Sequence, residues 1–189
     1  TVDTYTITYA ATDAAGNDAI SVTRTVKVVD TTKPVITLAG DAVVTIEVGE
    51  SYDEQGVTVS DNYDTNLTVT IDSSAVNMSV LGSYSVIYSA TDSSLNQAVE
   101  VTRTVTVVDN TPPVVTLVGN AEVTIEMGES YTELGAAVSD NYDTGLSATI
   151  DSSAVNTSVV GEYTVTYNVT DGNSNVAQQV TRTVKVVDT

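Results

Sequence analysis

The chain has 189 residues, of which 25 are Asp or Glu and 6 are Lys or Arg, so its formal net charge at pH 7 is −19. It contains no His, Cys, Phe or Trp, which excludes imidazole bases, Ser-His-Asp triads, thiolate nucleophiles, disulfides and zinc or iron–sulfur sites built on His or Cys. A chain this acidic is expected to be repelled by nucleic acid and by anionic lipid surfaces.

The composition favours β-structure. Val and Thr account for about a third of the chain, with 35 and 32 residues respectively. Their β-branched side chains are stiff at χ1 and fit a pleated, half-buried surface better than a helix. No apolar run approaches the ~20 residues that span a bilayer, so we expect an all-β chain without direct membrane insertion.

An internal repeat organises the sequence. Residues 31–109 and 110–188 align without a gap, and 51 of the 79 pairs are identical. Residues 1–30 fit the last part of the same pattern, with Tyr5 matching Tyr84 and Asp30 matching Asp109. This register predicts a C-terminal hairpin of an incomplete repeat over 1–30, followed by repeats over 31–109 and 110–189.

Short alternating segments separated by turn residues predict the strands. In the first complete repeat they cover 35–38, 43–48, a segment ending near Val59, 67–71, 84–90 and 98–108. About seven strands in 79 residues is the density of an immunoglobulin-like β-sandwich. Tyr84 and Tyr88 share a face of their strand, and we expect them in the core with their hydroxyls at its rim.

The first 30 residues supply only the last two strands of a repeat, and an isolated hairpin is marginally stable in water. Two explanations are open. Either the missing strands precede Thr1 in a longer chain, or a neighbouring molecule supplies them by strand complementation.

Five motifs carry a resemblance to a known family. They are PVITL at 34–38, VGESY at 48–52, DNYD at 61–64, GSYSV at 82–86 and VTVVD at 105–109. Together they resemble the bacterial immunoglobulin-like repeats that are strung in tandem in large adhesin-type surface proteins. They are also similar to hyaline repeats and to the immunoglobulin-like domain of a pesticidal crystal protein. The resemblance implies an extracellular, secreted or cell-surface location and a spacer or adhesion role rather than a reaction.

Strand direction predicts that acidic loops gather at each repeat junction. Strands alternate in direction, so the loops over 61–64 and 92–96 should lie beside the linker that enters the repeat at Asp30. The same holds one repeat later. The candidate ligands are Asp30, Asp61, Asn62, Asp64, Asp92 and Asn96 at the first junction and Asp109, Asp140, Asn141, Asp143, Asp171 and Asn175 at the second.

Carboxylates gathered in this way repel one another unless a cation neutralises them. Ca²⁺ accepts six to eight oxygen ligands in flexible geometry, whereas Mg²⁺ demands a stricter octahedron. Ca²⁺ is therefore the predicted cofactor. The alternative is turn chemistry alone, because Asp and Asn side chains stabilise turns by bonding to nearby backbone amides.

The three arginines at equivalent positions, Arg24, Arg103 and Arg182, share strand parity with core valines. Each is expected to lay its aliphatic stem on the sandwich and pair with an acid, with Glu47 and Glu126 as candidates.

These observations favour a structural spacer, a stalk segment of a long extracellular protein, rigidified by calcium between adjacent repeats of the chain. One alternative is a repeat that packs with other copies into a filament or layer, by strand complementation or lateral contact. Another is a glycan- or protein-binding module that uses Tyr63 and Tyr142. A carboxylate-pair glycosidase would need a substrate groove, which the pattern does not imply, so no enzyme activity is expected.

Overall fold

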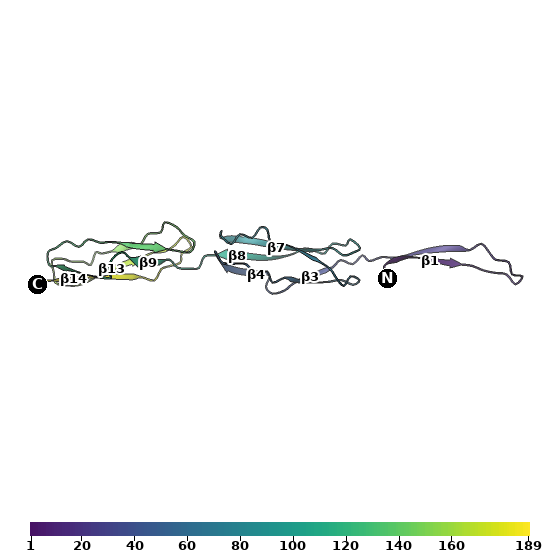
Figure 1. The fold of residues 1–189 in the computed structure, drawn as a ribbon, viewed down its shortest axis with the longest axis horizontal. Coiled ribbons are helices and arrows are strands. Elements are labelled where there is room, and N and C mark those ends of the chain that lie inside the picture. Colours follow the sequence, from purple (N-terminus) through teal and green to yellow (C-terminus); the bar gives the residue numbers. More distant parts are fainter. The chain divides into compact units, whose positions relative to one another are not determined.

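The computed structural model describes residues 1–189 and contains fourteen β-strands and no helix (Figure 1). It accordingly has no helix long and apolar enough to cross a membrane. The first two strands, β1 (Asp3–Tyr9) and β2 (Val22–Val28), form an antiparallel pair. The predicted all-β class is confirmed.

Six strands follow in the first complete repeat. They are β3 (Val35–Leu38), β4 (Val43–Glu47), β5 (Val57–Ser60), β6 (Val69–Asp72), β7 (Gly82–Ala90) and β8 (Val101–Val108). β3 pairs with β5, and the others form a sheet in the order β4-β8-β7-β6. The last strand begins at Val101 rather than at 98, and Thr91 and Gln97 form an isolated bridge where the hairpin loop closes.

The second complete repeat has the same plan. Its strands are β9 (Val114–Leu117), β10 (Glu122–Glu126), β11 (Ala136–Ser139), β12 (Thr149–Asp151), β13 (Gly161–Asn168) and β14 (Val180–Val187). β9 pairs with β11, and the other sheet has the order β10-β14-β13-β12, in which β10 runs parallel to β14. Each repeat thus has six strands in two sheets, against about seven predicted.

A glycine lets the chain change sheets between β9 and β10. Gly119 has φ +83°, and a Cβ atom there would lie 2.8 Å from Leu134 Cδ1. Glycine adopts positive φ without the steric cost that other residues meet. The first strand of the repeat is therefore split, and its two halves pair with different sheets.

The core lies on the inward-facing side of the two long strands. Val165, Tyr167 and Val184 are fully buried, and so are their equivalents Val86, Tyr88 and Val105. Side chains of a strand point alternately to opposite faces, so every second residue of these strands enters the core. The hydroxyl of Tyr88 donates to Glu54 Oε1 at 2.7 Å, as expected for a tyrosine with its polar end at the core edge.

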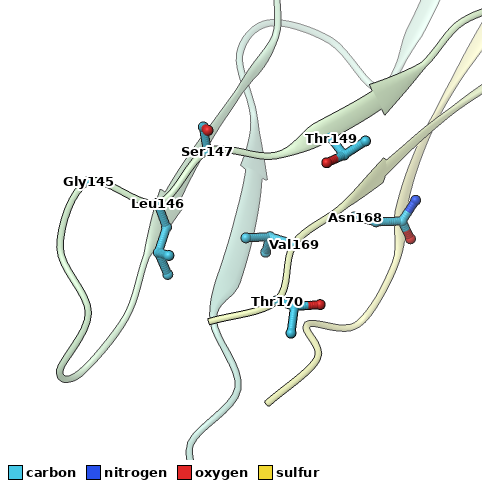
Figure 2. A pocket seen from close by; sticks show the side chains of 7 residues that line it. All are labelled: Gly145, Leu146, Ser147, Thr149, Asn168, Val169 and Thr170. Carbon is cyan, nitrogen blue, oxygen red and sulfur yellow. The ribbon is translucent and has the colours of Figure 1, made fainter. Parts of the chain in front are cut away.

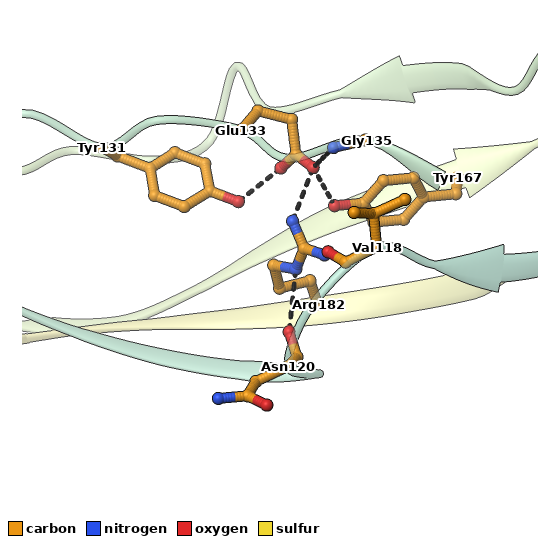
Figure 3. A network of polar contacts seen from close by, with 7 residues as sticks. All are labelled: Val118, Asn120, Tyr131, Glu133, Gly135, Tyr167 and Arg182. Carbon is orange, nitrogen blue, oxygen red and sulfur yellow. Dashed lines mark hydrogen bonds and ion pairs between the residues drawn. The ribbon is translucent and has the colours of Figure 1, made fainter. Parts of the chain in front are cut away.

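Each complete repeat also buries an arginine completely. The acid that pairs with this arginine is not the one predicted from the sequence. Arg182 pairs with Glu133 at 2.6 Å, and Arg103 pairs with Glu54 at the same distance. The predicted pairing with Glu47 or Glu126 is wrong, because Glu133 lies in the loop before β11 and reaches Arg182 across the sandwich (Figure 3).

The hairpin β1–β2 keeps the register of a complete repeat. Ile7 lies opposite Arg24, just as Val165 lies opposite Arg182. Its core-side residues are nevertheless exposed: Tyr9 is 47% exposed, whereas the equivalent Tyr167 is fully buried. Nothing in the described chain covers this face.

The chain divides into two compact units. The first comprises Thr1–Val44, Asp53–Val76 and Ser85–Val105, and the second comprises Thr45–Tyr52, Asn77–Tyr84 and Thr106–Thr189. The predicted junction at Asp30 lies inside the first unit and that at Asp109 inside the second. The repeat boundaries over 1–30, 31–109 and 110–189 remain a prediction, and each junction can be described within one unit.

Candidate metal sites at the repeat junctions

Four aspartates meet in the first unit. One carboxylate oxygen from each of Asp30, Asp61, Asp64 and Asp92 lies within 4.8 Å of the others. Asp30 follows β2, Asp61 follows β5, and Asp92 follows β7. Asp30 is 7% exposed and Asp92 is 4% exposed. The predicted convergence of a linker and two loops is therefore present in the structure.

Local turn chemistry shapes the loop that begins at Asp61. Its Oδ1 accepts hydrogen bonds from the backbone N–H of Tyr63 at 2.9 Å and of Asp64 at 3.1 Å. These bonds, with that of Tyr63 first, lower the pKa of Asp61 below its ordinary value because they favour the charged form. Asp61 is therefore a carboxylate at neutral pH.

The second loop closes in a similar way. Asp92 Oδ1 accepts from the backbone N–H of Asn96 at 2.7 Å, and Leu95 between them has φ +70°. Asn96 Nδ2 donates to Asp92 Oδ2 at 2.7 Å and to the backbone carbonyl of Asp30 at 3.3 Å. Asn96 thus ties the loop to the linker through its NH₂ group.

Asp64 joins the two loops of the first cluster. Its Oδ2 accepts from the backbone N–H of Ser93 at 3.0 Å, and its Oδ1 accepts from the Ser93 hydroxyl at 2.9 Å. Every segment of the cluster is therefore held by hydrogen bonds before any cation is considered.

One buried oxygen in this cluster has no partner. Asp30 Oδ1 accepts from Thr32 N at 2.9 Å, but Asp30 Oδ2 is buried and makes no hydrogen bond. A buried carboxylate oxygen without a donor is costly. One terminal atom of the Asn62 side-chain amide faces the same two carboxylates. It lies 3.3 Å from Asp30 Oδ1 and 3.2 Å from Asp61 Oδ1. In one orientation it donates to these carboxylates, and in the other it adds an amide oxygen to the cluster.

The second unit repeats the arrangement. One oxygen from each of Asp109, Asp140, Asp143 and Asp171 lies within 4.8 Å of the others. Asp140 Oδ2 is buried and makes no hydrogen bond. Burial of Asp171 would raise its pKa, but the bonds from Asn175 and from the loop backbone outweigh burial, so the pKa is lowered.

Polar side chains again brace this cluster. Asn175 Nδ2 donates to Asp171 Oδ2 at 2.7 Å and to the Asp109 carbonyl at 3.2 Å. Asn173 Nδ2 donates to Asp109 Oδ2 at 2.9 Å. Asn141 differs from Asn62, because its amide donates to Glu47 Oε1 at 3.3 Å instead.

The structure therefore places all eight predicted aspartates in clusters, four in each. The four predicted asparagines differ in the groups that their side chains face. Asn96 and Asn175 donate to aspartates from within the clusters, Asn62 faces carboxylates, and Asn141 faces Glu47. Sequence reasoning missed Ser93 and Asn173, which vary between repeats. It also missed Glu47 at the junction.

A surface hollow of the second repeat is lined by no aspartate of either cluster. A cavity of about 420 Å³ lies between the segment over 145–149 and the end of β13 (Figure 2). Its lining is made of Leu, Val, Ser, Thr, Asn and Gly residues, none of which is ionisable.

The chain is a tandem array of all-β sandwiches, and an acidic cluster lies at the start of each complete repeat. The chain belongs to the family described as "Bacterial surface protein, Ig-like domain", which matches residues 36–107 and 115–186. The resemblance predicted from the five motifs is confirmed.

Two similar proteins are hyalins of sea urchins. The hyalin of Strongylocentrotus purpuratus is 34% identical over 201 residues, which cover 100% of this chain and 17% of hyalin. The hyalin of Lytechinus variegatus is 34% identical over 196 residues, which cover 96% of this chain and 36% of hyalin. The chain thus spans little more than a third of these relatives at most.

Among solved structures, the fibronectin(III)-like modules of Clostridium thermocellum CbhA match with a TM-score of 0.34 and 15% identity, covering 81% of this chain and 94% of that one. The family assignment itself identifies a surface module of structural or adhesion type. It indicates no catalytic family and agrees with a surface or extracellular location.

Proposed function

We propose that this chain is a spacer segment of a long extracellular surface protein, in which Ca²⁺ bound at each repeat junction fixes the linker to the repeat that follows. The proposal extends the family's surface-structural role to a specific cofactor and a mechanical task. The two aspartate clusters are the proposed working parts.

A buried, unpaired carboxylate oxygen within each cluster is the observation that supports the proposal. Asp30 Oδ2 and Asp140 Oδ2 have no hydrogen-bond donor, although three other carboxylates lie within a few ångströms of each. Hydrogen bonds from turns satisfy many of the remaining oxygens, so turn chemistry alone leaves these two atoms unexplained. A cation would satisfy them and offset the mutual repulsion of four negative charges.

The available donors favour Ca²⁺ over other divalent ions. All are hard oxygen ligands, and they come from a linker and two separate loops rather than from one rigid frame. Ca²⁺ tolerates such irregular geometry and can complete its shell with backbone carbonyls and water. Mg²⁺ holds a stricter octahedron, and zinc prefers nitrogen and sulfur ligands.

Binding would couple the linker to the repeat. Asp109 belongs to the linker, Asp140 and Asp143 to one loop, and Asp171 to another. An ion that contacts all four would resist any displacement of the linker from the loops. Without it, the linker is held to these loops by side-chain bonds such as those of Asn175 and Asn173 to Asp109.

Thermal unfolding of the whole chain tests this function. Millimolar Ca²⁺ should raise the melting temperature relative to chelator, because a ligand that binds the folded state stabilises it. Asp140→Asn should reduce the increase, whereas Asp53→Asn should not, since Asp53 is exposed and outside both clusters. An equal melting temperature with Ca²⁺ and with chelator would contradict the proposal.

Terbium luminescence supplies a direct binding readout. Tyr63 and Tyr142 lie within the cluster loops, and a nearby tyrosine can sensitise Tb³⁺ emission. Emission should rise on titration, fall on addition of Ca²⁺, and weaken in the double variant Asp61→Asn, Asp140→Asn. Emission unchanged by that double variant would place the bound ion elsewhere on this acidic surface.

A second candidate function concerns other copies of the protein. Ile7 is 43% exposed and Tyr9 is 47% exposed, although their equivalents Val165 and Tyr167 are fully buried. Strands from a neighbouring molecule could cover this face. Sedimentation velocity of the whole chain should then show concentration-dependent association that Ile7→Asp abolishes. A monomer at all concentrations would exclude assembly through this hairpin.

A further inference from the structure

Glu47 makes a set of contacts that neither the fold nor the cation sites require. It ends β4, yet its carboxylate bonds to residues that follow Asp109. Oε1 lies 2.9 Å and Oε2 3.1 Å from the donating backbone nitrogen of Asn110. Oε1 also accepts from the Thr111 hydroxyl at 2.7 Å and from Asn141 Nδ2 at 3.3 Å.

These contacts connect three parts of the chain. Glu47 belongs to the second strand of one repeat, Asn110 and Thr111 belong to the linker, and Asn141 belongs to the DNYD loop of the next repeat. The hydrogen bonds lower the pKa of Glu47, that of the Thr111 hydroxyl first. Bonds to an ionised acceptor are stronger than neutral ones.

The linker half of this arrangement recurs in the next repeat. Glu126 is equivalent to Glu47, and Thr189 is equivalent to Asn110. Glu126 Oε2 accepts from the backbone N–H of Thr189 at 3.4 Å, and its Oε1 accepts from the Thr189 hydroxyl. The same strand-ending glutamate therefore bonds to the following linker residue in both repeats.

The two DNYD loops differ in the partners of their asparagines, and Glu47 accounts for the difference. Asn62 and Asn141 occupy the same position in identical motifs. Asn62 faces Thr32 Oγ1 and Asp30 Oδ1, both at 3.3 Å. Asn141 and Thr111, the equivalents of Asn62 and Thr32, both donate to Glu47 instead. The identical loops therefore differ in the atoms that their asparagines approach.

We propose that the glutamate ending the second strand of each repeat is a clasp that docks the repeat that follows. It binds the linker through a backbone N–H and the loop through an asparagine amide, and it needs no cation to do so. The clasp adds to the proposed spacer function a second set of contacts that orients successive repeats. The group that it binds on the following repeat is the side-chain amide of the asparagine in the DNYD loop.

Spin labels on either side of the junction can test the clasp. The chain has no cysteine, so Val99→Cys and Val176→Cys, which are 74% and 63% exposed, provide two unique attachment points. In chelator, Glu47→Ala should broaden the distribution of label-to-label distances. Glu126→Ala should leave it unchanged, because Glu126 bonds to Thr189 rather than to a following loop.

Hydrogen exchange gives an independent readout of the same contact. The Asn110 amide should exchange about tenfold faster in Glu47→Ala, as expected for the loss of one charge-assisted hydrogen bond. In Glu126→Ala it should retain its protection. Unchanged label distances and unchanged Asn110 exchange in Glu47→Ala would overturn the clasp, provided that both variants melt like the parent chain.

The clasp and the cation site can fail separately. All clasp measurements are made in chelator, so they do not depend on Ca²⁺. The calcium proposal would be refuted, and the clasp supported, if Ca²⁺ leaves the melting temperature of the parent chain unchanged while Glu47→Ala broadens the label distances in chelator. A rise in melting temperature with Ca²⁺, with label distances in chelator unchanged by Glu47→Ala, would support the calcium proposal and refute the clasp.

Discussion

Nη1 of Arg182 lies 2.6 Å from Oε1 of Glu133, and the arginine side chain is completely buried. The rest of the guanidinium is bonded to the carbonyls of Val118 and Asn120 (Figure 3). Its charge lies 5.6 Å from the centre of the Tyr167 ring, within reach of a cation–π attraction. Each complete repeat has such an ion pair between a fully buried arginine and a glutamate that is partly exposed.

Removal of this arginine should strongly destabilise its repeat. Arg182→Met should cost about 3 kcal/mol, because it leaves the charge of Glu133 uncompensated and removes the donor of two carbonyls. Arg24→Met is the matched control, since Arg24 holds the same register position in an exposed hairpin and should change stability by less than about 0.5 kcal/mol. Chemical unfolding measures both. Equal effects would mean that the buried network contributes nothing beyond packing.

The same network predicts pH dependence at both extremes. Burial would raise the pKa of Glu133, but hydrogen bonds from Tyr131, Tyr167 and Gly135 and the charge of Arg182 outweigh it, so the pKa is lowered. Its contribution to stability is then present above the ordinary carboxyl pKa near 4 and is lost as the pH falls through the lowered value. Glu133→Gln should flatten the acid side of the stability curve.

On the alkaline side, burial raises the pKa of Tyr131 and Tyr167. Their contribution is complete below the ordinary tyrosine pKa of about 10 and is lost as the pH rises towards the raised values. Ultraviolet titration of the folded chain should show tyrosines that ionise well above pH 10. Their normal ionisation in a chain still folded would contradict the network.

Calcium should act at the two clusters independently. An ion at 100 times its dissociation constant stabilises a site by about 2.7 kcal/mol. Asp61→Asn should remove only the contribution of the first cluster, and Asp140→Asn only that of the second, because they belong to separate clusters. Calorimetric titration of each variant should show about half the parent's binding. Complete loss of binding from either single change would indicate one shared site.

The hairpin loop of the first complete repeat contains a correctable strain. Leu95 has φ +70° and is 82% exposed, whereas the equivalent Gly16 has φ +86°. A side chain in this region costs about 1 kcal/mol relative to glycine. Leu95→Gly should therefore stabilise the chain by up to about 1 kcal/mol. Ser94→Gly is the control, since Ser94 has no positive φ, and it should slightly destabilise. Denaturant unfolding distinguishes the two.

Much of the junction could be predicted from strand order alone. Alternating strand direction places the loops after β5 and β7 beside the linker, and Asp30, Asp61 and Asp92 meet there as expected. The partner of the buried arginine could not be predicted in this way. Glu54 and Glu133 lie in irregular loops, where no periodicity indicates which way a side chain points, whereas Glu47 and Glu126 lie in strands, where alternation indicates a direction.

The repeat register, the β-class and the identity of the clustered aspartates were determined by the sequence by itself. Periodicity and turn chemistry act over a few neighbouring residues and indicate the strands and turns. The alternating direction of those strands then brings the acidic loops to one end of the repeat. Only the tertiary structure decided that Glu47 bonds to Asn110 and Asn141, and that Asn96 donates to Asp92 while Asn62 faces Asp30. Those contacts depend on where separate segments of the chain come within hydrogen-bond distance of about 3 Å, and local sequence patterns do not specify that.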